Sequence, residues 1–527
     1  MKIKILLLVI ILLGAVLRLY KLDLVPPSLN WDEAAVGYNA YTIANSGRDE
    51  YGNFFPLYFL SFGEGKNPIH IYFTALSVKI LGLNELSTRL PSALFGIFNI
   101  ILIFLLVRVV FNKETLALLV AFSLAISPFN IHFSRFNHEA NFALFFFMLG
   151  IYTFFLTIKR GKALLLLSTV SFCFSFLSYN AAKIFIPLTM ILLFILYINN
   201  LIKFKKQLIG SILIIFLFCF LLFINPQLLG KARADQTIQG RGEVENTYLF
   251  KMTSNELLGR INLAAMQYSW HFSPQFLFIT GDKNPKLSSQ TGEFYKIDLL
   301  FLIAGVLFLI LKRSKEGFFI LVWALLGPIP SSLVAESPHA ARAMFMMGSW
   351  HILSALGFYF LISFSKNPLF KKIVTVTFII LLTYFLKDYL SYYYGEYAKR
   401  YAIEWQYGMK QTVEYIKDNN QYSQVFVTDV RAQPYIFFLY HLKTPLHEYL
   451  NSAIYNNSIS KSYNNVSTFN NFYFGGWDPI ESFPNEGILY VLSPSEYDGL
   501  RHKQLFEVKK LIYYPNGQTA FFLVSAI

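Results

Sequence analysis

Residues 203–224 read KFKKQLIGSILIIFLFCFLLFI, in which a basic cluster is followed by a nearly uninterrupted apolar run. Such a run approaches the roughly 20 residues that an α-helix needs to span a bilayer. Similar runs occupy residues 3–19 and 373–386. Basic residues beside a span tend to stay on the cytoplasmic side, so this stretch also predicts an orientation.

The composition of the whole chain agrees with a polytopic membrane protein. The 527 residues are 55% hydrophobic and only 14% charged, whereas a soluble chain carries about 25% charged residues. The first apolar run follows Lys2 and Lys4, as in a signal peptide, but no small-residue cleavage site follows it, so we expect a retained helix. Cys173 and Cys219 both lie in apolar runs and predict neither a disulfide nor a metal ligand.

We predict about eleven membrane spans from apolar length. Their expected ranges are 3–20, 88–107, 114–131, 140–158, 163–178, 184–201, 208–224, 298–311, 317–334, 343–363 and 371–388. This arrangement places the basic clusters between spans on one face, which the positive-inside rule makes cytoplasmic. The net charge of +14 is thereby explained without nucleic acid. We expect the N-terminus in the cytoplasm of a prokaryotic cell and the tail outside its plasma membrane.

The predicted fold class is an α-helical membrane bundle followed by a small α/β domain. Residues 1–388 form the expected transmembrane catalytic domain, with outer loops at 21–87 and 225–297. Residues 389–527 form the expected extracytoplasmic domain, with a helix at 404–417 and a terminal hairpin that turns at Pro515-Asn516-Gly517. In the first loop we expect a helix at 32–45 and a second helix at 68–81, lying in the membrane interface.

The segment NWDEAA (30–35) places two carboxylates at the outer mouth of the bundle. Asn30 is a good helix N-cap, and Glu33 completes the spacing of a capping box. One interpretation is therefore structural, with acids stabilising a helix N-terminus. The other is catalytic, because a lipid-borne substrate would enter here. We assign the cap to Glu33 and proton transfer to Asp32, and keep both as candidate catalytic residues.

A second acidic group lies at the outer start of the fourth span, in SRFNHEAN (134–141). Ionisable groups at a helix mouth in the membrane favour a functional site. Glu139 is the candidate catalytic residue, and Arg135 and His138 are expected to support it. The alternative is a solvated loop end with an Arg135–Glu139 salt bridge.

Basic side chains on the outer face depart from the positive-inside pattern. Lys66, Lys183, His339 and Arg342 are candidate ligands for the phosphate of a lipid carrier, and His70 is a supporting residue. The alternative for these cations is that they snorkel to the lipid headgroups.

Two further kinds of candidate remain. Some are residues of the second outer loop, and others could form a metal site if they lie close together in the fold. The loop holds Arg233, Arg241, His271 and Asp282, and its polar stretch 231–246 could close over a substrate. No HExxH, CxxC or P-loop spacing is present in the sequence. No cofactor is certain, but a divalent metal could bind if five oxygen- and nitrogen-bearing residues converge. These are Asp32, Glu33, His70, His138 and Glu139.

In residues 1–390 the chain resembles the GT-C glycosyltransferases that use polyprenyl-phosphate sugars, in particular protein mannosyltransferases and aminoarabinose transferases (glycosyltransferase family 39 or 83 type). The resemblance rests on four short elements in order. They are Asp32-Glu33, the NPIHIY segment (67–72), RLPSAL (89–94) and Glu139 at the head of a span. It implies transfer of a mannose-like or aminoarabinose-like sugar to a hydroxyl on an acceptor protein, lipid or glycan, with inversion.

The chemistry implied by this resemblance assigns a role to each charged group. Asp32 would take the acceptor's proton, and Glu139 would orient the acceptor. Lys183 and Arg342, helped by His339, would hold the leaving phosphate, whose charge grows in the transition state.

Three rival functions stay open at this point. A transporter or flippase for lipid-linked sugars would place ionisable groups nearer mid-membrane. An oligosaccharide ligase or polymerase would share most of the chemistry. A structural membrane protein whose tail binds a partner would leave the outer acids and cations unexplained.

Overall fold

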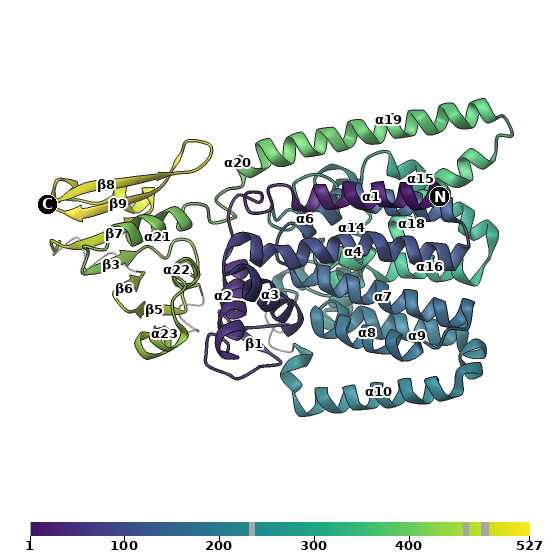
Figure 1. The fold of residues 1–527 in the computed structure, drawn as a ribbon, viewed down its shortest axis with the longest axis horizontal. Coiled ribbons are helices and arrows are strands. Elements are labelled where there is room, and N and C mark those ends of the chain that lie inside the picture. Colours follow the sequence, from purple (N-terminus) through teal and green to yellow (C-terminus); the bar gives the residue numbers. More distant parts are fainter. Residues whose placement is uncertain (1, 231–237, 457–462, 476–483) are drawn as a thin grey trace. The chain divides into compact units, whose positions relative to one another are not determined.

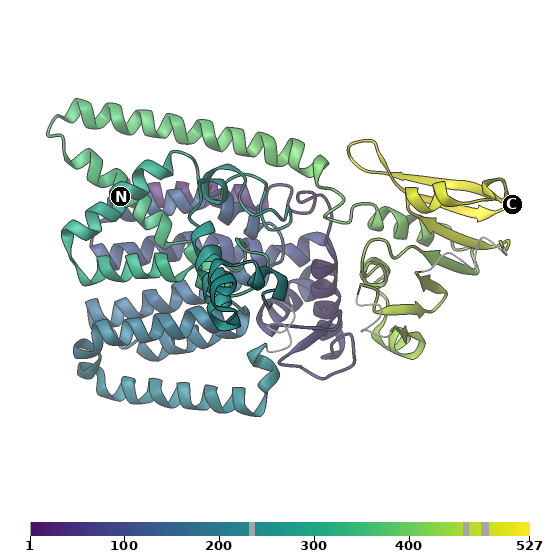
Figure 2. The same ribbon diagram turned by 180° about the vertical axis from the view of Figure 1, so that it is seen from behind.

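The computed structural model describes residues 2–230, 238–456, 463–475 and 484–527, drawn as a ribbon in Figures 1 and 2. The chain forms two compact units. A helical unit comprises Met1–Tyr20 and Ser92–Tyr392, and a mixed unit comprises Lys21–Pro91 and Tyr393–Ile527. The first outer loop thus groups with the C-terminal residues, whereas the sequence-based division at residue 388 assigned it to the membrane domain.

The helical unit is built mainly of long apolar helices that lie side by side (Figure 1). Its principal helices are α1 (Lys2–Leu19), α4 (Glu85–Phe111, whose first turns belong to the mixed unit), α5 (Glu114–Ile126), α6 (Pro128–Ser134), α7 (Glu139–Arg160), α8 (Leu165–Ser178), α9 (Ala182–Leu201), α10 (Lys205–Ile224), α14 (Glu256–Trp270), α15 (Asp298–Lys312), α16 (Lys315–Leu326), α17 (Ile329–Ser332), α18 (Ser349–Ser363) and α19 (Pro368–Tyr392).

Each predicted span coincides with at least one of these helices, which makes the chain an integral membrane protein. Among the described residues, five helices are long and apolar enough to cross a membrane, or six if the bent pair α5–α6 is one span. The number of crossings stays a prediction. The ninth predicted span is interrupted after Leu326, where Pro328 and Pro330 follow, and the tenth begins as helix only at Ser349.

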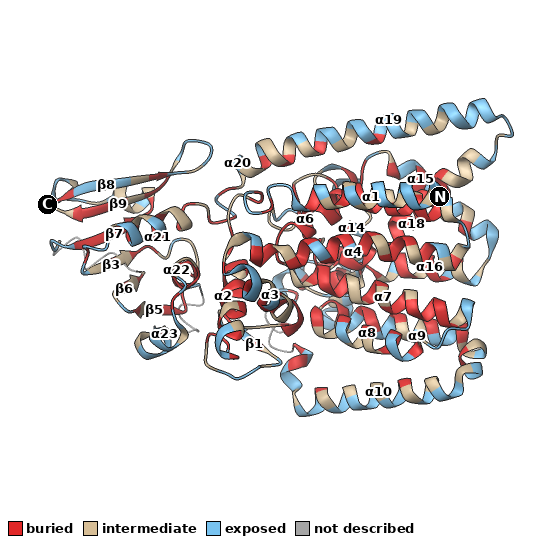
Figure 3. Cartoon of the chain, in the orientation of Figure 1, coloured by how far each residue is buried: buried red, intermediate tan, exposed pale blue. Residues whose placement is uncertain are grey.

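Two helices lie at the outer edges of the helical unit in both views, α10 and α19 (Figures 1 and 2). Only 6% of the most apolar window of each is buried, against 78% in α7. Figure 3 shows their exposed faces. Apolar residues with this exposure suit contact with lipid tails.

The mixed unit contains a seven-stranded sheet in the order β4-β5-β6-β3-β7-β9-β8. Its strands are β3 (Gln424–Val427), β4 (Ile454–Tyr455), β5 (Val466–Phe469), β6 (Phe472–Phe474), β7 (Ile488–Leu492), β8 (Phe506–Tyr513) and β9 (Thr519–Ala526). The central strand β3 is parallel to both β6 and β7, and the remaining pairs are antiparallel. The helices of this unit are α2 (Trp31–Ser46), α3 (Pro68–Leu81), α20 (Ala398–Arg400), α21 (Met409–Asp418), α22 (Tyr435–Leu442), α23 (Leu446–Ser452) and α24 (Pro494–Gly499), and a small hairpin pairs β1 (Phe59–Ser61) with β2 (Glu64–Lys66).

One hydrophobic core joins both chain segments of the mixed unit. It contains Tyr38 and Val78 from the first outer loop together with Val413, Phe437 and Leu523 from the C-terminal residues. Burial of apolar area is the main favourable term in folding, so α2 and α3 depend on the C-terminal residues for their stability.

The local predictions for the mixed unit are largely confirmed. The helix at 68–81 and the terminal hairpin between β8 and β9 lie where we expected them. The helix predicted at 404–417 instead begins at Met409. Gln406 and Gly408 both have positive φ, 51° and 105°, which breaks a right-handed helix before that point.

Two glycines let α15 and α18 approach each other closely in the helical unit. A Cβ added to Gly305 would lie 2.0 Å from the Leu353 carbonyl oxygen, and one added to Gly357 would lie 1.8 Å from the Phe301 carbonyl oxygen. Small residues at such positions let helix backbones approach closely in a membrane.

We expect Gly357→Ala to lower the thermal unfolding midpoint in detergent, because the new methyl group must push α15 and α18 apart at a cost of about 1–3 kcal/mol. Gly242→Ala is the matched control, since no heavy atom lies within 4 Å of an added Cβ there. An unchanged midpoint for Gly357→Ala would contradict the close packing.

Candidate active site

The N-terminus of α2 is fixed by the cap that the sequence predicted. The Asn30 side-chain oxygen accepts a hydrogen bond from the Glu33 backbone N–H at 2.9 Å, and Gly47 ends the helix in the left-handed region at φ 70°. The Glu33 side chain was predicted to complete the cap, but in the structure its carboxylate binds Arg89.

Arg89 and Glu33 form a fully buried ion pair within the mixed unit. The Arg89 Nε and Nη2 atoms lie 2.9 Å and 3.0 Å from the two Glu33 carboxylate oxygens, and neither side chain is exposed. The guanidinium also donates to the carbonyl oxygens of Leu22, Pro26 and Ser28. Arg89 therefore holds the chain that leads into α2. This arginine belongs to the RLPSAL segment (89–94), but the sequence pattern predicted no role for it.

Asp32 has a different environment from its neighbour. Its side chain is 43% exposed and forms an ion pair with Lys66, whose Nζ lies 2.5 Å from Asp32 Oδ1. Lys66 ends β2, so the β1–β2 hairpin brings this cation to the start of α2. The two adjacent carboxylates thus differ in environment, since Glu33 is buried in an ion pair and Asp32 is partly exposed. Proton transfer by Asp32 stays a prediction. Phosphate binding by Lys66 stays a prediction.

His70 lies in the first turn of α3, in the same unit as Asp32. Its side chain is buried, and its carbonyl oxygen accepts a bond from Thr74 Oγ1 at 2.7 Å. α3 packs directly against α2, so His70 belongs to the scaffold of the helix that carries Asp32. Its supporting role stays a prediction.

Glu139 is the first residue of α7 in the helical unit. His138 caps the helix, accepting the Ala140 N–H at Nδ1 over 3.1 Å. Arg135 is fully buried and donates to the carbonyl oxygens of Leu17 and Tyr20 at the end of α1. Arg135 therefore ties α1 to the segment that precedes Glu139.

Lys183 lies close enough to Glu139 for their charges to interact. Its Nζ donates to Asn180 Oδ1 at 2.5 Å. A Cβ at Gly230 would lie 2.9 Å from that Nζ, so the absence of a side chain at Gly230 leaves room for the ammonium group. The structure thus brings together two predicted site residues that are distant in sequence.

His339 and Arg342 share one turn, held by Asp282. The Asp282 Oδ2 atom accepts the Ala340 N–H at 2.6 Å and lies 4.0 Å from His339 Nδ1. Arg342 donates through Nη1 to the Ala335 carbonyl oxygen at 2.6 Å. Two candidate phosphate ligands are therefore positioned by a buried carboxylate in the second outer loop.

A second buried acid, Glu293, lies beside Asp282 and was missed by sequence reasoning. Its Oε1 accepts the Asp282 N–H at 3.3 Å. Burial raises the pKa of Asp282 to about 6 and raises the pKa of Glu293 well above its ordinary range. Its neighbours in the sequence, Gly292 and Phe294, give no pattern that could have marked it.

The other candidates of the second loop have local roles. Arg241 pairs with Glu245 one turn along α12 (Arg241–Glu245), and both are exposed. His271 is buried, its Nδ1 contacts the Gln267 carbonyl oxygen, and burial lowers its pKa to about 4. Arg233 and much of the 231–246 stretch lie outside the described residues.

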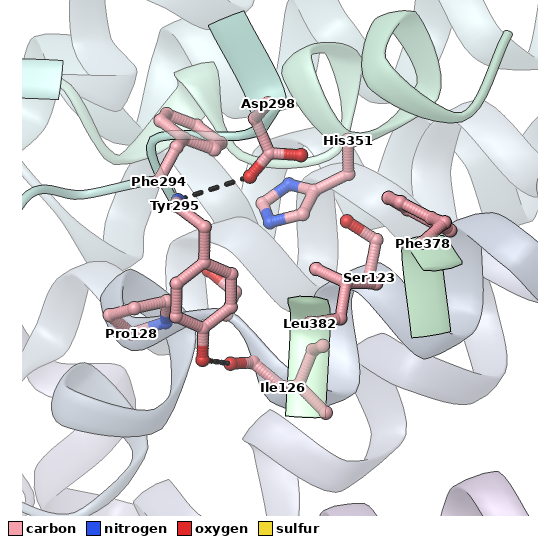
Figure 4. Close-up of a pocket in the computed structure, with 10 residues that line it drawn as sticks. Ser123, Ile126, Pro128, Phe294, Tyr295, Asp298, His351, Phe378 and Leu382 are labelled. Carbon is pink, nitrogen blue, oxygen red and sulfur yellow. Dashed lines mark hydrogen bonds between the residues drawn. The ribbon is translucent and has the colours of Figure 1, made fainter. Parts of the chain in front are cut away.

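A small cavity with a mixed polar and apolar lining lies inside the helical unit (Figure 4). Its volume is about 20 Å³, enough for a water molecule but too small for a sugar. Asp298 accepts bonds from the Ser354 hydroxyl and the Tyr295 N–H at its edge. His351 Nε2, buried beside it, has no hydrogen-bond partner among the described residues. This cavity is therefore not the substrate site.

No cluster of three or more His, Cys, Asp or Glu that could hold a metal ion occurs among the described parts of the chain. The five residues suggested as ligands are Asp32, Glu33, His70, His138 and Glu139.

The family described as dolichyl-phosphate-mannose-protein mannosyltransferase matches residues 65–224. A curated relative, the putative mannosyltransferase YkcB of Bacillus subtilis, is 29% identical over 167 residues. That match covers 31% of this chain and 22% of the relative, so the chain spans about a fifth of the relative's length. These similarities agree with the elements quoted from residues 67–94.

Solved structures of the same architecture cover nearly the whole chain. ArnT of Cupriavidus metallidurans in the apo state superposes with a TM-score of 0.54 at 12% identity, covering 99% of this chain and 97% of ArnT. An oligosaccharyltransferase of Archaeoglobus fulgidus, tethered to an acceptor peptide, gives a TM-score of 0.52 at 16% identity over 98% of this chain and 74% of its own. The protein therefore has the fold of GT-C glycosyltransferases, which confirms the expected fold class.

We expect Glu33→Gln to lower the thermal unfolding midpoint in detergent markedly, because it leaves the Arg89 charge buried without its counter-ion. Breaking a buried pair costs about 3–5 kcal/mol. The neighbouring isosteric change, Asp32→Asn, removes a half-exposed pair worth at most about 1 kcal/mol. Equal midpoints for the two variants would contradict the structural role of Glu33.

Proposed function

We propose that the protein is a membrane glycosyltransferase that moves a sugar from a polyprenyl-phosphate donor to an acceptor hydroxyl on the extracytoplasmic side. Asp32 is the general base. The observation that carries the proposal is the contrast between two adjacent carboxylates, since Glu33 is buried in an ion pair whereas Asp32 is accessible at a helix N-terminus. The GT-C fold and the mannosyltransferase similarity support the same reaction class.

The donor chemistry is supported by a related structure. ArnT of Cupriavidus metallidurans has also been solved bound to undecaprenyl phosphate, with a TM-score of 0.51 to this chain at 12% identity. In a polyprenyl-phosphate sugar, the lipid phosphate itself is the group that leaves the sugar. We infer a mannose-like or aminoarabinose-like sugar and an acceptor that is a protein, lipid or glycan.

The reaction is a displacement at the anomeric carbon. The acceptor oxygen forms a bond to that carbon as the bond to the phosphate oxygen breaks, and Asp32 takes the hydroxyl proton. The bonding electrons leave with polyprenyl phosphate. Attack from the face opposite the phosphate inverts the configuration, and the developing positive charge on the sugar resembles that in glycoside hydrolysis.

Cationic groups stabilise the departing phosphate in this scheme. Lys183 and Arg342 are assigned to it, with His339 and Lys66 in support, because growing negative charge is best met by preorganised donors. Asn180 orients Lys183, and Asp282 orients the turn that carries His339 and Arg342. Glu139 is assigned to acceptor orientation.

We expect Asp32→Asn to lower the transfer rate by about 10²–10⁴-fold, the usual contribution of a general base. Purified protein would be incubated with a panel of polyprenyl-phosphate sugars and acceptor fractions, and product would be measured by mass spectrometry. Asp23→Asn, an isosteric change at an exposed carboxylate of the same loop, is the control and should retain wild-type activity. Most of the activity surviving in Asp32→Asn would refute the base assignment.

We further expect Asp32 and Glu139 to face one outward cavity together with Arg342. Cysteines placed at 32 and 139, in a chain whose free Cys173 and Cys219 are replaced by serine, should be joined by a short bifunctional maleimide. A cysteine at 316, beside the predicted cytoplasmic loop, gives the control pair with position 32. Cross-linking of the control pair alone would show that the two acids do not share a site.

A further inference from the structure

The residue that precedes Asp32 is bound by a side chain from the far end of the sequence. The Trp31 backbone N–H donates to Gln406 Oε1 at 2.7 Å. This N–H is the first of α2, one of the donors that a helix leaves without an internal partner. Asn30 accepts the Glu33 N–H in the same turn, so two side chains, one local and one distant, hold the backbone on either side of Asp32.

Gln406 is itself rigidly placed. Its side-chain amide donates to the Ala432 carbonyl oxygen at 3.0 Å, and only 2% of the residue is exposed. Its backbone has φ 51°, a left-handed conformation that L residues seldom adopt. The strained turn 401–408 thus presents this amide to α2.

Trp405, which precedes Gln406, contacts Arg89, the second residue that holds the start of α2. The Arg89 guanidinium lies over the Trp405 ring, 5.9 Å from its centroid. Trp405 is fully buried, and its Nε1 donates to the Tyr397 hydroxyl at 2.9 Å. Arg89 in turn binds Glu33, the residue after Asp32. Trp405 therefore supports Glu33 indirectly, by packing against the arginine that binds it.

We propose that Trp405 and Gln406 form a clamp by which the C-terminal residues position Asp32 for proton transfer. This inference rests on the proposed function, in which Asp32 is the base. It gives the C-terminal domain a role in catalysis that needs no contact with substrate. Gln406 and Trp405 are positioning residues, since both act through the backbone and ion pair around Asp32.

Further hydrogen bonds join the two chain segments of the mixed unit. The Tyr435 hydroxyl donates to Glu50 Oε1 at 3.0 Å, and Asn39 of α2 donates to Glu50 Oε2 at 2.8 Å. The Tyr440 and Thr88 hydroxyls lie 2.8 Å apart. The clamp at 405–406 therefore ends a continuous interface within the mixed unit, beside the catalytic carboxylate.

The direct test is Gln406→Met, which keeps the volume of the side chain but removes both hydrogen bonds. We expect kcat to fall about tenfold or more while KM for the polyprenyl-phosphate donor stays within about twofold, because misplacing a base affects the chemical step. Gln433→Met is the matched control. Gln433 is also a buried glutamine with positive φ in this domain, and its side chain accepts the Asn465 N–H, away from α2.

Two further variants guard against simple loss of folding. Gln406→Asn tolerates the left-handed backbone, but its amide is one methylene too short to reach Trp31, so it should show the same selective fall in kcat. Gln406→Glu retains an acceptor for the Trp31 N–H, and a carboxylate is favoured at a helix N-terminus, but it loses the donor to the Ala432 carbonyl oxygen. Its kcat should therefore lie between those of the wild type and Gln406→Met. Wild-type kcat in Gln406→Met or in Gln406→Asn would overturn the clamp.

A double-mutant cycle separates positioning from general stability. In an Asp32→Glu background the base is already misplaced, so Gln406→Met should lower kcat by less than about twofold more. Full additivity of the two changes would overturn the clamp. If Asp32→Asn retains activity, the base assignment itself is wrong; if Asp32→Asn is inactive while Gln406→Met is normal, only the clamp is wrong.

Discussion

The buried pair between Arg89 and Glu33 is the interaction on which the candidate site in the mixed unit depends. Taking two charges out of water is costly, and the cost is met only when every donor finds an acceptor. Arg89 meets this condition by binding the Glu33 carboxylate and three carbonyl oxygens of the segment before α2. Displacing α2 would leave a charge unsatisfied, which fixes the helix and hence Asp32.

This constraint also gives each of the two adjacent acids its own task. Successive residues of a helix point in different directions, so Glu33 turns into the protein while Asp32 turns toward Lys66 and solvent. Glu33 is used for structure, and in the proposed function Asp32 is thereby held in place for proton transfer. In the helical unit Asp282 has a similar task, because it holds the turn that carries His339 and Arg342.

Much of the fold could be predicted from the sequence because membrane helices obey local rules. Apolar length placed a helix at every predicted span, and turn and capping signals placed the terminal hairpin and the ends of α2. The errors fall where local signals conflict. The helix expected at 404–417 begins only after Gln406 and Gly408, whose positive φ values serve long-range contacts rather than local propensity.

The sequence by itself determined the membrane class, the helices and the candidate charged residues, since each depends on composition or short spacing. Only the tertiary structure decided which acid is buried, that Glu293 lies beside Asp282, and that Gln406 binds the backbone next to Asp32. The first outer loop and the C-terminal residues share one hydrophobic core although hundreds of positions separate them. Such pairings follow from burial and hydrogen bonding in three dimensions, which no local pattern in a single sequence records.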